Sequence, residues 1–163
     1  MGLLPFARCK RIFDIDLEFL SKNNVTHIFV DLDNTLAPWH SLNVPEQTFS
    51  WVEKVKNQGI KIIILTNSRK KNADIIAEKL AIGVFKDARK PFKAATKKLI
   101  KQENVCSDNV LFVGDQLFTD IALANSLKAK SVLTEPLSKK EWWCTKVFNR
   151  SREKLVWRFL FKD

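Results

Sequence analysis

Residues 29–36 read Phe29-Val30-Asp31-Leu32-Asp33-Asn34-Thr35-Leu36 and follow directly on the apolar Ile28. β-Branched and aromatic residues of this kind favour a buried strand. The strand delivers two carboxylates, two positions apart, at its C-terminal end, and alternate side chains of a strand share a face. Two like charges that close are unfavourable unless a cation or a shared proton lies between them. The segment therefore predicts a strand end that holds a cation.

Apolar strand-like runs alternate with helix-like runs along the rest of the chain. The pattern predicts strands over residues 25–32, 60–65, 84–85, 110–113 and 131–133. It predicts helices over residues 45–57, 70–80, 93–103 and 119–127. Such alternation is typical of a parallel sheet covered by helices on both faces. We therefore expect an α/β fold, a Rossmann-like three-layer sandwich around a central parallel sheet.

Polar residues gather at the C-terminal ends of three predicted strands. They are Asp31, Asp33 and Thr35, then Thr66 and Asn67, then Gly114 and Asp115. In open parallel sheets, ligands bind outside these strand ends, near the point where the strand order reverses. We therefore expect the three clusters to form one site. Each cluster alone has a plainer interpretation, as a turn or a helix cap.

The residue types at these strand ends suit hydrolysis of a phosphate monoester, which is very slow in water. A carboxylate can attack phosphorus and split the reaction into two steps. A Mg²⁺ ion and a lysine can neutralise the phosphate charge, and a second carboxyl can carry the proton. Hydroxyl and amide donors can hold the phosphoryl oxygens. The candidates are Asp31, Asp33, Thr66, Asn67, Lys90 and Asp115.

Four motifs, in order along the chain, resemble those of the haloacid dehalogenase (HAD) superfamily. Residues 31–36 resemble its DxDxT signature, and residues 64–67 resemble its strand that ends in Ser or Thr. Lys90-Pro91 resembles the phosphate-side lysine, and residues 113–120 resemble the GDxxxxD strand end. The short gaps between motifs leave no room for a cap domain, which is typical of the capless subclass III. Residues 12–17, 33–39, 114–120 and 146–150 are similar to the YqeG family of subfamily IIIA phosphatases, a relative of the mitochondrial phosphatidylglycerophosphate phosphatases.

The resemblance implies three catalytic residues. Asp31 would be the nucleophile and a Mg²⁺ ligand. Asp33 would be the general acid and base, and its backbone carbonyl would bind the metal. Lys90 would neutralise the nucleophile and the phosphate; Lys86 and Arg89 lie nearby but match the motif less well.

The resemblance also implies the surrounding roles. Thr66 and the backbone of Asn67 would hold the phosphoryl group, and Asp115 would be the remaining metal ligand. Asp120 would orient the metal's water or Lys90 from a second shell. Asn34 fills the variable position of the first motif and would act through its backbone amide.

The chain ends in an extension, residues 136–163, that mixes basic and aromatic side chains, among them Trp142, Trp143, Lys146, Arg150 and Trp157. Such a mixture suits an interface with an anionic bilayer. The N-terminal Leu3-Leu4-Pro5-Phe6, followed by Arg8, Lys10 and Arg11, would be a second contact. Three alternatives stay open for the extension: it packs on the sheet of its own domain, pairs with a second subunit, or binds single-stranded nucleic acid.

The bulk composition limits the class of protein. A length of 163 residues fits one domain, 1–163, and a hydrophobic share of 45% suits a globular core. The net charge of +10 favours anionic partners. The three cysteines are scattered along the chain, which predicts reduced thiols in the cytoplasm. The chain has no apolar run of roughly 18–20 residues, so we expect at most a peripheral contact with the inner face of a membrane.

The favoured function is thus a Mg²⁺-dependent phosphatase that acts through an aspartyl phosphate, with phosphatidylglycerophosphate as substrate. One alternative is a soluble phosphatase that acts on a nucleotide, a sugar phosphate or a nucleic-acid end. Another is a binding module that keeps the fold without catalysis. The intact set of Asp31, Asp33, Lys90 and Asp115 argues against the binding module.

Overall fold

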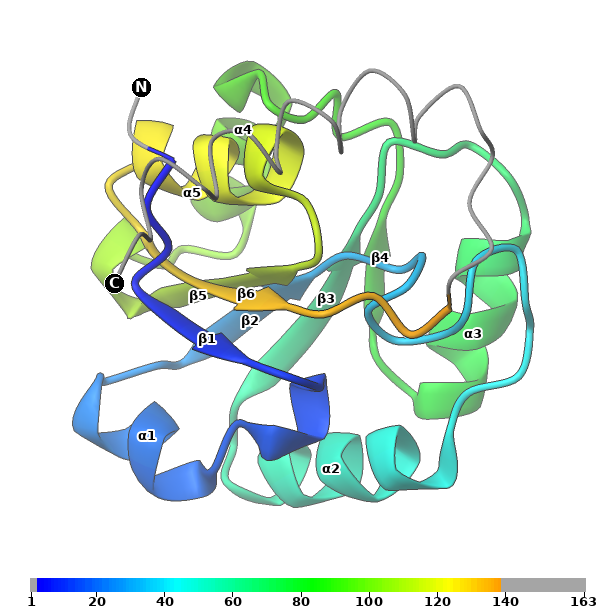
Figure 1. The fold of residues 1–163 in the computed structure, drawn as a ribbon. Coiled ribbons are helices and arrows are strands. Elements are labelled where there is room, and N and C mark those ends of the chain that lie inside the picture. Colours follow the sequence, from blue (N-terminus) through cyan, green and yellow to red (C-terminus); the bar gives the residue numbers. More distant parts are fainter. Residues whose placement is uncertain (1–2, 139–163) are drawn as a thin grey trace, which may run out of the picture.

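The computed structural model describes residues 3–138 and has a six-stranded, fully parallel sheet at its centre (Figure 1). The strand order is β1-β6-β5-β2-β3-β4. The strands are β1 (Ala7–Cys9), β2 (His27–Val30), β3 (Lys61–Leu65), β4 (Gly83–Phe85), β5 (Val110–Gly114) and β6 (Lys130–Thr134). Of the expected basic and aromatic extension, residues 136–163, the part from residue 139 onward lies outside the described residues.

Helices join the strands and cover both faces of the sheet. They are α1 (Leu17–Lys22), α2 (Glu46–Asn57), α3 (Asn72–Leu80), α4 (Lys93–Gln102) and α5 (Ala122–Ser126). Two short 3₁₀ turns, Ile12–Asp14 and Ser107–Asn109, and a π-turn, Leu117–Ile121, complete the elements.

The side chains of the central strands alternate between two separate cores. Ile28 and Val30 of β2 point into the larger core, which α1, α2 and α3 cover. Phe29, between them, points to the opposite side and meets Phe112 of β5 edge to face, under α4 and α5. Figure 1 shows the same arrangement, with α1 and α2 on one side of the sheet and α4 and α5 on the other. The expected three-layer sandwich is confirmed.

The order of the strands reverses beside β2. The chain runs outward from β2 to β3 and β4, and then returns to the other side of β2 as β5. Val30 pairs with Ile64 on one side and with Val113 on the other, so the three strands end level. A crevice forms where two neighbouring strands send their connections to opposite faces. Within residues 3–138, no domain is inserted between these elements, as expected of a capless chain.

Two elements of the structure were not predicted, and one predicted helix begins at a different residue. β1 and α1 were not expected, because β1 is a short edge strand with alternating exposure and α1 is a six-residue helix. Asp16 caps α1, and its carboxylate accepts a hydrogen bond from the Phe19 amide. The helix predicted over residues 119–127 begins earlier, as the π-turn, and continues as α5.

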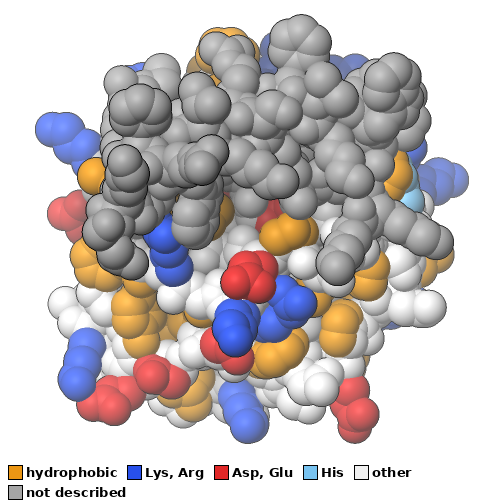
Figure 2. Space-filling view, viewed as in Figure 1, with side chains coloured by type: hydrophobic (Ala, Val, Ile, Leu, Met, Phe, Trp, Pro, Cys, Tyr) orange, Lys and Arg blue, Asp and Glu red, His pale blue; other side chains and the backbone are white. Residues whose placement is uncertain are grey.

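Charge and hydrophobic surface are interspersed on the face shown in Figure 2, where basic, acidic and apolar side chains lie next to one another. The excess of positive charge therefore forms no continuous patch among the described residues visible there. None of the helices within residues 3–138 combines the length and the apolar character needed to cross a bilayer.

Candidate active site

A tight loop follows β2 and carries the first two candidate carboxylates. The Asp31 amide continues the ladder by one bond, to the Val113 carbonyl at 2.8 Å. The chain then turns, and Asn34 takes a positive φ of 65°, which Asn tolerates better than most residues. The Asp33 carboxylate accepts a hydrogen bond from the His40 amide at 3.1 Å. A turn, rather than a continued strand, thus brings Asp31 and Asp33 to one place.

Lys90 lies between two carboxylates in the interior. Its side chain is 4% exposed, and its Nζ donates to Asp31 Oδ1 at 2.5 Å and to Asp120 Oδ1 at 2.6 Å. A charge this deeply buried persists only when it is paired and hydrogen-bonded. The lysine and the two acids therefore form one ionic unit.

The ionic unit shifts the protonation of its members. Burial raises the pKa of the Asp31 carboxyl to about 7, against the opposing effect of Lys90 and with the help of the nearby Asp120 charge. Burial alone would lower the pKa of the Lys90 ammonium. The carboxylates of Asp120 and Asp31 outweigh that effect and raise the pKa above its ordinary value, so Lys90 stays charged.

Asn67 fixes the backbone of Lys90. The Asn67 side chain donates to the Lys90 carbonyl at 3.0 Å and accepts from the Lys90 amide at 2.6 Å. This reciprocal pair joins the loop after β3 to the loop after β4. Thr66 is buried at the end of β3, and its hydroxyl oxygen accepts from the Ser68 amide at 3.1 Å.

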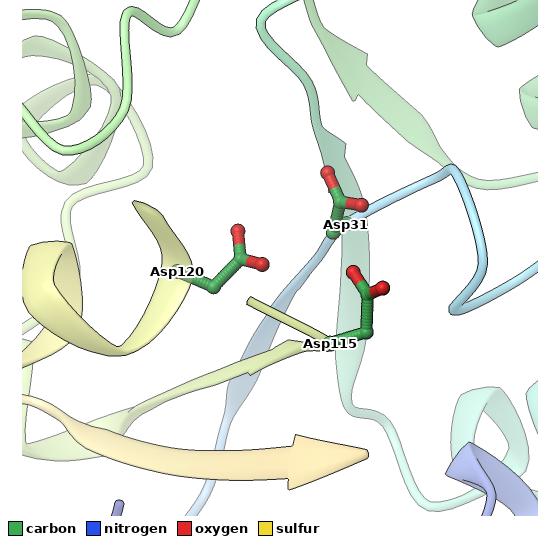
Figure 3. Close-up of side chains that lie close together, drawn as sticks. All are labelled: Asp31, Asp115 and Asp120. Atoms are coloured by element: carbon green, nitrogen blue, oxygen red, sulfur yellow. The ribbon is translucent and has the colours of Figure 1, made fainter. Parts of the chain in front are cut away.

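Three carboxylates converge at the ends of β2 and β5. One oxygen from each of Asp31, Asp115 and Asp120 lies within 4.8 Å of the others, and Figure 3 shows the side chains pointing toward a common space. Gly114 makes room for Asp120, because a Cβ at position 114 would lie 2.6 Å from the Asp120 Cβ. Contacts under 3.0 Å essentially never occur for real Cβ atoms.

This cluster fits a hard divalent cation. Carboxylate oxygens are the ligands that Mg²⁺, Mn²⁺ and Ca²⁺ prefer, and three buried acids close together need a compensating charge. Lys90 supplies one positive charge to the cluster, and a metal ion held by Asp31 and Asp115 would supply the rest. Asp120, expected in a second shell, contributes an oxygen to the cluster and also binds Lys90.

A pocket of about 150 Å³ opens beside the ionic unit. It is lined by Asp31, Asp33, Asn34, Trp39, Thr66, Asn67, Ser68, Lys90, Gln116 and Thr119. Sites that enclose a drug-sized ligand measure roughly 300–1,000 Å³. The pocket therefore accommodates a group of phosphoryl size and leaves the remainder of a larger molecule outside.

The structure brings all the predicted site residues together. Asp31, Asp33, Thr66, Asn67 and Lys90 line one pocket, and Asp115 and Asp120 join it through Asp31. The Asn34 amide was expected to serve the site, but it donates to the Ala37 carbonyl at 2.7 Å within its own turn. Trp39 follows the first motif, where the sequence left open whether it lines the mouth of the site or only packs, and it lines the pocket. Gln116 and Thr119 also line the pocket and were not expected to, because they fill variable positions of the motif over residues 113–120.

Comparison with known proteins indicates a phosphatase. A model of the family described as mitochondrial PGP phosphatase matches residues 2–138. Probable phosphatase YqeG of Bacillus subtilis (strain 168) is 32% identical over 153 residues, 94% of this chain and 88% of that protein. Phosphatidylglycerophosphate phosphatase 1, chloroplastic/mitochondrial, of Arabidopsis thaliana is 28% identical over 148 residues, 85% of this chain and 42% of that protein. The chain thus spans less than half of the Arabidopsis protein.

Solved structures share the fold at low sequence identity. A protein from Listeria monocytogenes serotype 4b aligns with a TM-score of 0.58 at 18% identity, over 72% of this chain and 85% of its own. The cobalt-bound deoxy-D-mannose-octulosonate 8-phosphate phosphatase of Haemophilus influenzae aligns with a TM-score of 0.56 at 15% identity, over 69% of each chain. With the matching family model and the bacterial relative, the chain belongs to the mitochondrial PGP phosphatase family and is a phosphatase with a HAD-like fold.

Proposed function

We propose that this phosphatase is a Mg²⁺-dependent phosphomonoester hydrolase that acts through an aspartyl phosphate on Asp31, with phosphatidylglycerophosphate as its favoured substrate. The observation that carries the proposal is the buried unit in which Lys90 binds both Asp31 and Asp120, beside the carboxylate of Asp115. This unit combines carboxylates suited to nucleophilic attack and metal binding with a cation suited to neutralising phosphate.

In the first step, a carboxylate oxygen of Asp31 attacks phosphorus as the ester P–O bond breaks. Asp33 gives its proton to the departing alkoxide, so an alcohol leaves. Asp33 suits this role because its carboxylate lines the pocket and is not part of the acidic cluster. Lys90 holds the attacking carboxylate in place and offsets the charge that gathers on the phosphoryl oxygens.

In the second step, water attacks the phosphorus of the aspartyl phosphate while Asp33 takes its proton. The bond between phosphorus and the Asp31 oxygen breaks, which releases inorganic phosphate and restores the carboxylate. The Thr66 hydroxyl and nearby amides hold the nonbridging oxygens in both steps. Mg²⁺, held by Asp31, Asp115 and the Asp33 carbonyl, would supply positive charge for the phosphoryl oxygens.

The choice of phosphatidylglycerophosphate rests on the relatives and on the shape of the site. The Arabidopsis relative carries that lipid in its name, as does the matching family. The pocket takes in little more than a phosphoryl group, and no cap covers it within residues 3–138. A substrate whose bulk remains in a bilayer could therefore present its headgroup to the site.

A surface beside the pocket supports contact with an anionic membrane. Phe92 lies two residues after Lys90 and is 72% exposed, the largest exposure among the large hydrophobic side chains of residues 3–138. α4 begins at the next residue and contains no acidic residue; Lys93 is exposed at its start beside Phe92, and Lys97, Lys98 and Lys101 are exposed further along the helix, away from the pocket. An exposed aromatic ring with flanking lysines suits the interface of an anionic bilayer.

The second contact expected from the sequence lies elsewhere. Leu4 and Phe6 are 55% and 56% exposed, as a membrane contact would require. They precede β1, however, and β1 is parallel to the other strands. They therefore lie at the end of the sheet opposite the pocket, so Phe92 is the better candidate for a contact that also delivers substrate.

The deciding experiment measures phosphate release from phosphatidylglycerophosphate in mixed micelles, with and without Mg²⁺, by wild type and by Asp31→Asn. We expect Mg²⁺-dependent release that the variant lacks. A panel of p-nitrophenyl phosphate, nucleotides, sugar phosphates and a 5′-phosphorylated oligonucleotide is measured in parallel. Turnover of one of these compounds without turnover of the lipid would support the proposed phosphatase reaction but contradict the proposed substrate. No turnover of any compound would favour a noncatalytic binding module.

A further inference from the structure

The side chain of Asn34 joins two parts of the chain that are far apart in sequence. Its Oδ1 accepts hydrogen bonds from the Ser138 amide at 3.2 Å, from the Ser138 hydroxyl at 2.7 Å and from the Trp39 amide at 3.3 Å. Asn34 is 3% exposed. Loss of this buried carbonyl oxygen would leave several donors without partners, so the contact stabilises the folded chain at this point.

The same loop holds the carboxylate of Asp33. Asp33 Oδ1 accepts from the His40 amide, and Asn34 Oδ1 accepts from the amide of the preceding residue, Trp39. Two consecutive side chains thus bind two consecutive amides and close the loop of residues 33–40. The side chain of Asn34 extends this closure to Ser138.

The backbone reinforces the contact from both directions. The Leu137 amide donates to the Asn34 carbonyl at 2.9 Å. Further along, the Glu135 amide donates to the Lys10 carbonyl at 3.2 Å, and the Arg11 guanidinium donates to the Glu135 carbonyl at 3.2 Å. Residues 135–138 are therefore held between the end of β1 and the loop that carries Asp33.

We propose that Asn34 is a positioning residue: it fastens residues 137–138 to the loop of residues 33–40 and so holds the Asp33 carboxylate in line for proton transfer. This inference rests on the proposed function, in which Asp33 protonates the leaving oxygen. It gives the side chain of Asn34 a role of its own, since the turn itself needs only the backbone conformation.

The leaving group of the substrate distinguishes a positioning role from a merely structural one. A poor leaving group needs its proton during bond cleavage, whereas a good leaving group departs largely without help. A misplaced Asp33 therefore slows cleavage of phenyl phosphate much more than cleavage of p-nitrophenyl phosphate. The two esters have nearly the same shape, so a general loosening of the pocket affects both equally.

The experiment measures kcat/KM for both esters in wild type, Asn34→Gly, Ser138→Ala and Asp33→Asn. Glycine adopts the positive φ of Asn34 without strain, so Asn34→Gly removes the side-chain contact and keeps the turn. The matched control is Asn104→Gly, at an exposed position with a φ of 52°. Melting temperatures establish that each variant folds, and Ser138→Ala, which removes the hydroxyl donor at the other end of the contact, carries the test if Asn34→Gly does not fold.

We expect Asp33→Asn to lose roughly 10²–10⁴-fold in kcat/KM on phenyl phosphate and far less on p-nitrophenyl phosphate. Asn34→Gly should lose about tenfold in kcat/KM on phenyl phosphate and far less on p-nitrophenyl phosphate. Ser138→Ala should show a smaller loss with the same preference, and Asn104→Gly should show no loss on either ester. Equal losses on both esters in Asn34→Gly, beside a leaving-group effect in Asp33→Asn, would overturn the inference and leave the proposed function standing. If Asp33→Asn itself shows no leaving-group effect, the proposed role of Asp33 fails and the inference falls with it.

Discussion

Asp120 packs directly against Gly114, at the end of β5, and this contact determines where its carboxylate lies. A Cβ at position 114 would come within 2.6 Å of the Asp120 Cβ, so only glycine fits there without a shift. Because Asp120 binds Lys90, and Lys90 binds Asp31, the absence of one methyl group at Gly114 contributes to the placement of the whole ionic unit.

We predict that Gly114→Ala displaces Asp120 and loosens Lys90. The expected result is a loss of kcat/KM of at least tenfold and a destabilisation of about 1–3 kcal/mol, typical of overpacking. Turnover of p-nitrophenyl phosphate and chemical denaturation measure the two effects. Gly83→Ala is the control, because its Cβ would meet the side chain of Ile63 at 3.1 Å, away from the ionic unit. Full activity in Gly114→Ala would mean that Asp120 does not need its present position.

Removal of Lys90 should destabilise the metal-free protein. Lys90→Met leaves Asp31 and Asp120 buried without their cation, which typically costs about 3–5 kcal/mol. Urea denaturation in the presence of EDTA measures this cost. The control is Lys86→Met, which removes a half-exposed partner of Asp74 and should cost less than about 1 kcal/mol.

A second substitution tests whether the destabilisation of Lys90→Met arises from the loss of its ion pairs with Asp31 and Asp120. Adding Asp120→Asn to Lys90→Met removes one of the two unpaired charges and should recover part of the stability. Strict additivity of the two substitutions would show that the groups do not interact in the folded protein.

The raised pKa of Asp31 predicts a pH-dependent stability of the metal-free protein. The carboxyl binds a proton more tightly when folded, with a pKa of about 7 against an ordinary value of 3.8. Its contribution to stability is therefore fully present below about pH 4 and is lost as the pH rises through 7. We expect the melting temperature in EDTA to fall between pH 5 and pH 8, and Asp31→Asn to flatten this dependence.

The same proton competes with a metal ion for Asp31. Binding of Mg²⁺ requires the carboxylate, so the rise in melting temperature on addition of Mg²⁺ should be larger at pH 8 than at pH 6. Thermal denaturation at a fixed ionic strength measures this difference. An equal rise at both values would indicate that the ion binds without Asp31.

Phe92 should contribute to binding at a lipid surface. Because its ring is 72% exposed, Phe92→Ser should change the free energy of unfolding by no more than about 0.5 kcal/mol. We expect it to weaken sedimentation with vesicles that contain anionic lipid by several-fold. Phe49→Ser, at a 42% exposed position of α2, is the matched control and should leave sedimentation unchanged. Equal sedimentation of wild type and Phe92→Ser would remove the case for this contact.

The central part of the fold could be predicted because its signals are local. Beyond their first residues, β2, β3 and β5 are buried apolar runs, and Asp31, Thr66 and Asp115 each stand directly after one of them. Parallel strands that end level then bring Asp31, Thr66 and Asp115 to one edge. The placement of these residues follows from a pattern of a few neighbouring positions.

The contacts that the sequence did not indicate join distant positions. Asn34 and Ser138 are 104 residues apart, and Asn67 and Lys90 are 23 apart. Nothing in the neighbourhood of either asparagine specifies its partner, because a side-chain amide also suits an ordinary turn. β1 escaped prediction for a related reason: a three-residue edge strand gains its stability from β6, whose Val132 pairs with Ala7 from a distant part of the chain.

The small volume of the pocket has a consequence for regulation by the product. A site of about 150 Å³ recognises the part of the molecule that substrate and inorganic phosphate have in common, and little of the part that differs between them. Free phosphate therefore competes for the same place, and we expect competitive product inhibition of all substrates with one inhibition constant. An enzyme built in this way would slow down as the phosphate in its surroundings rises.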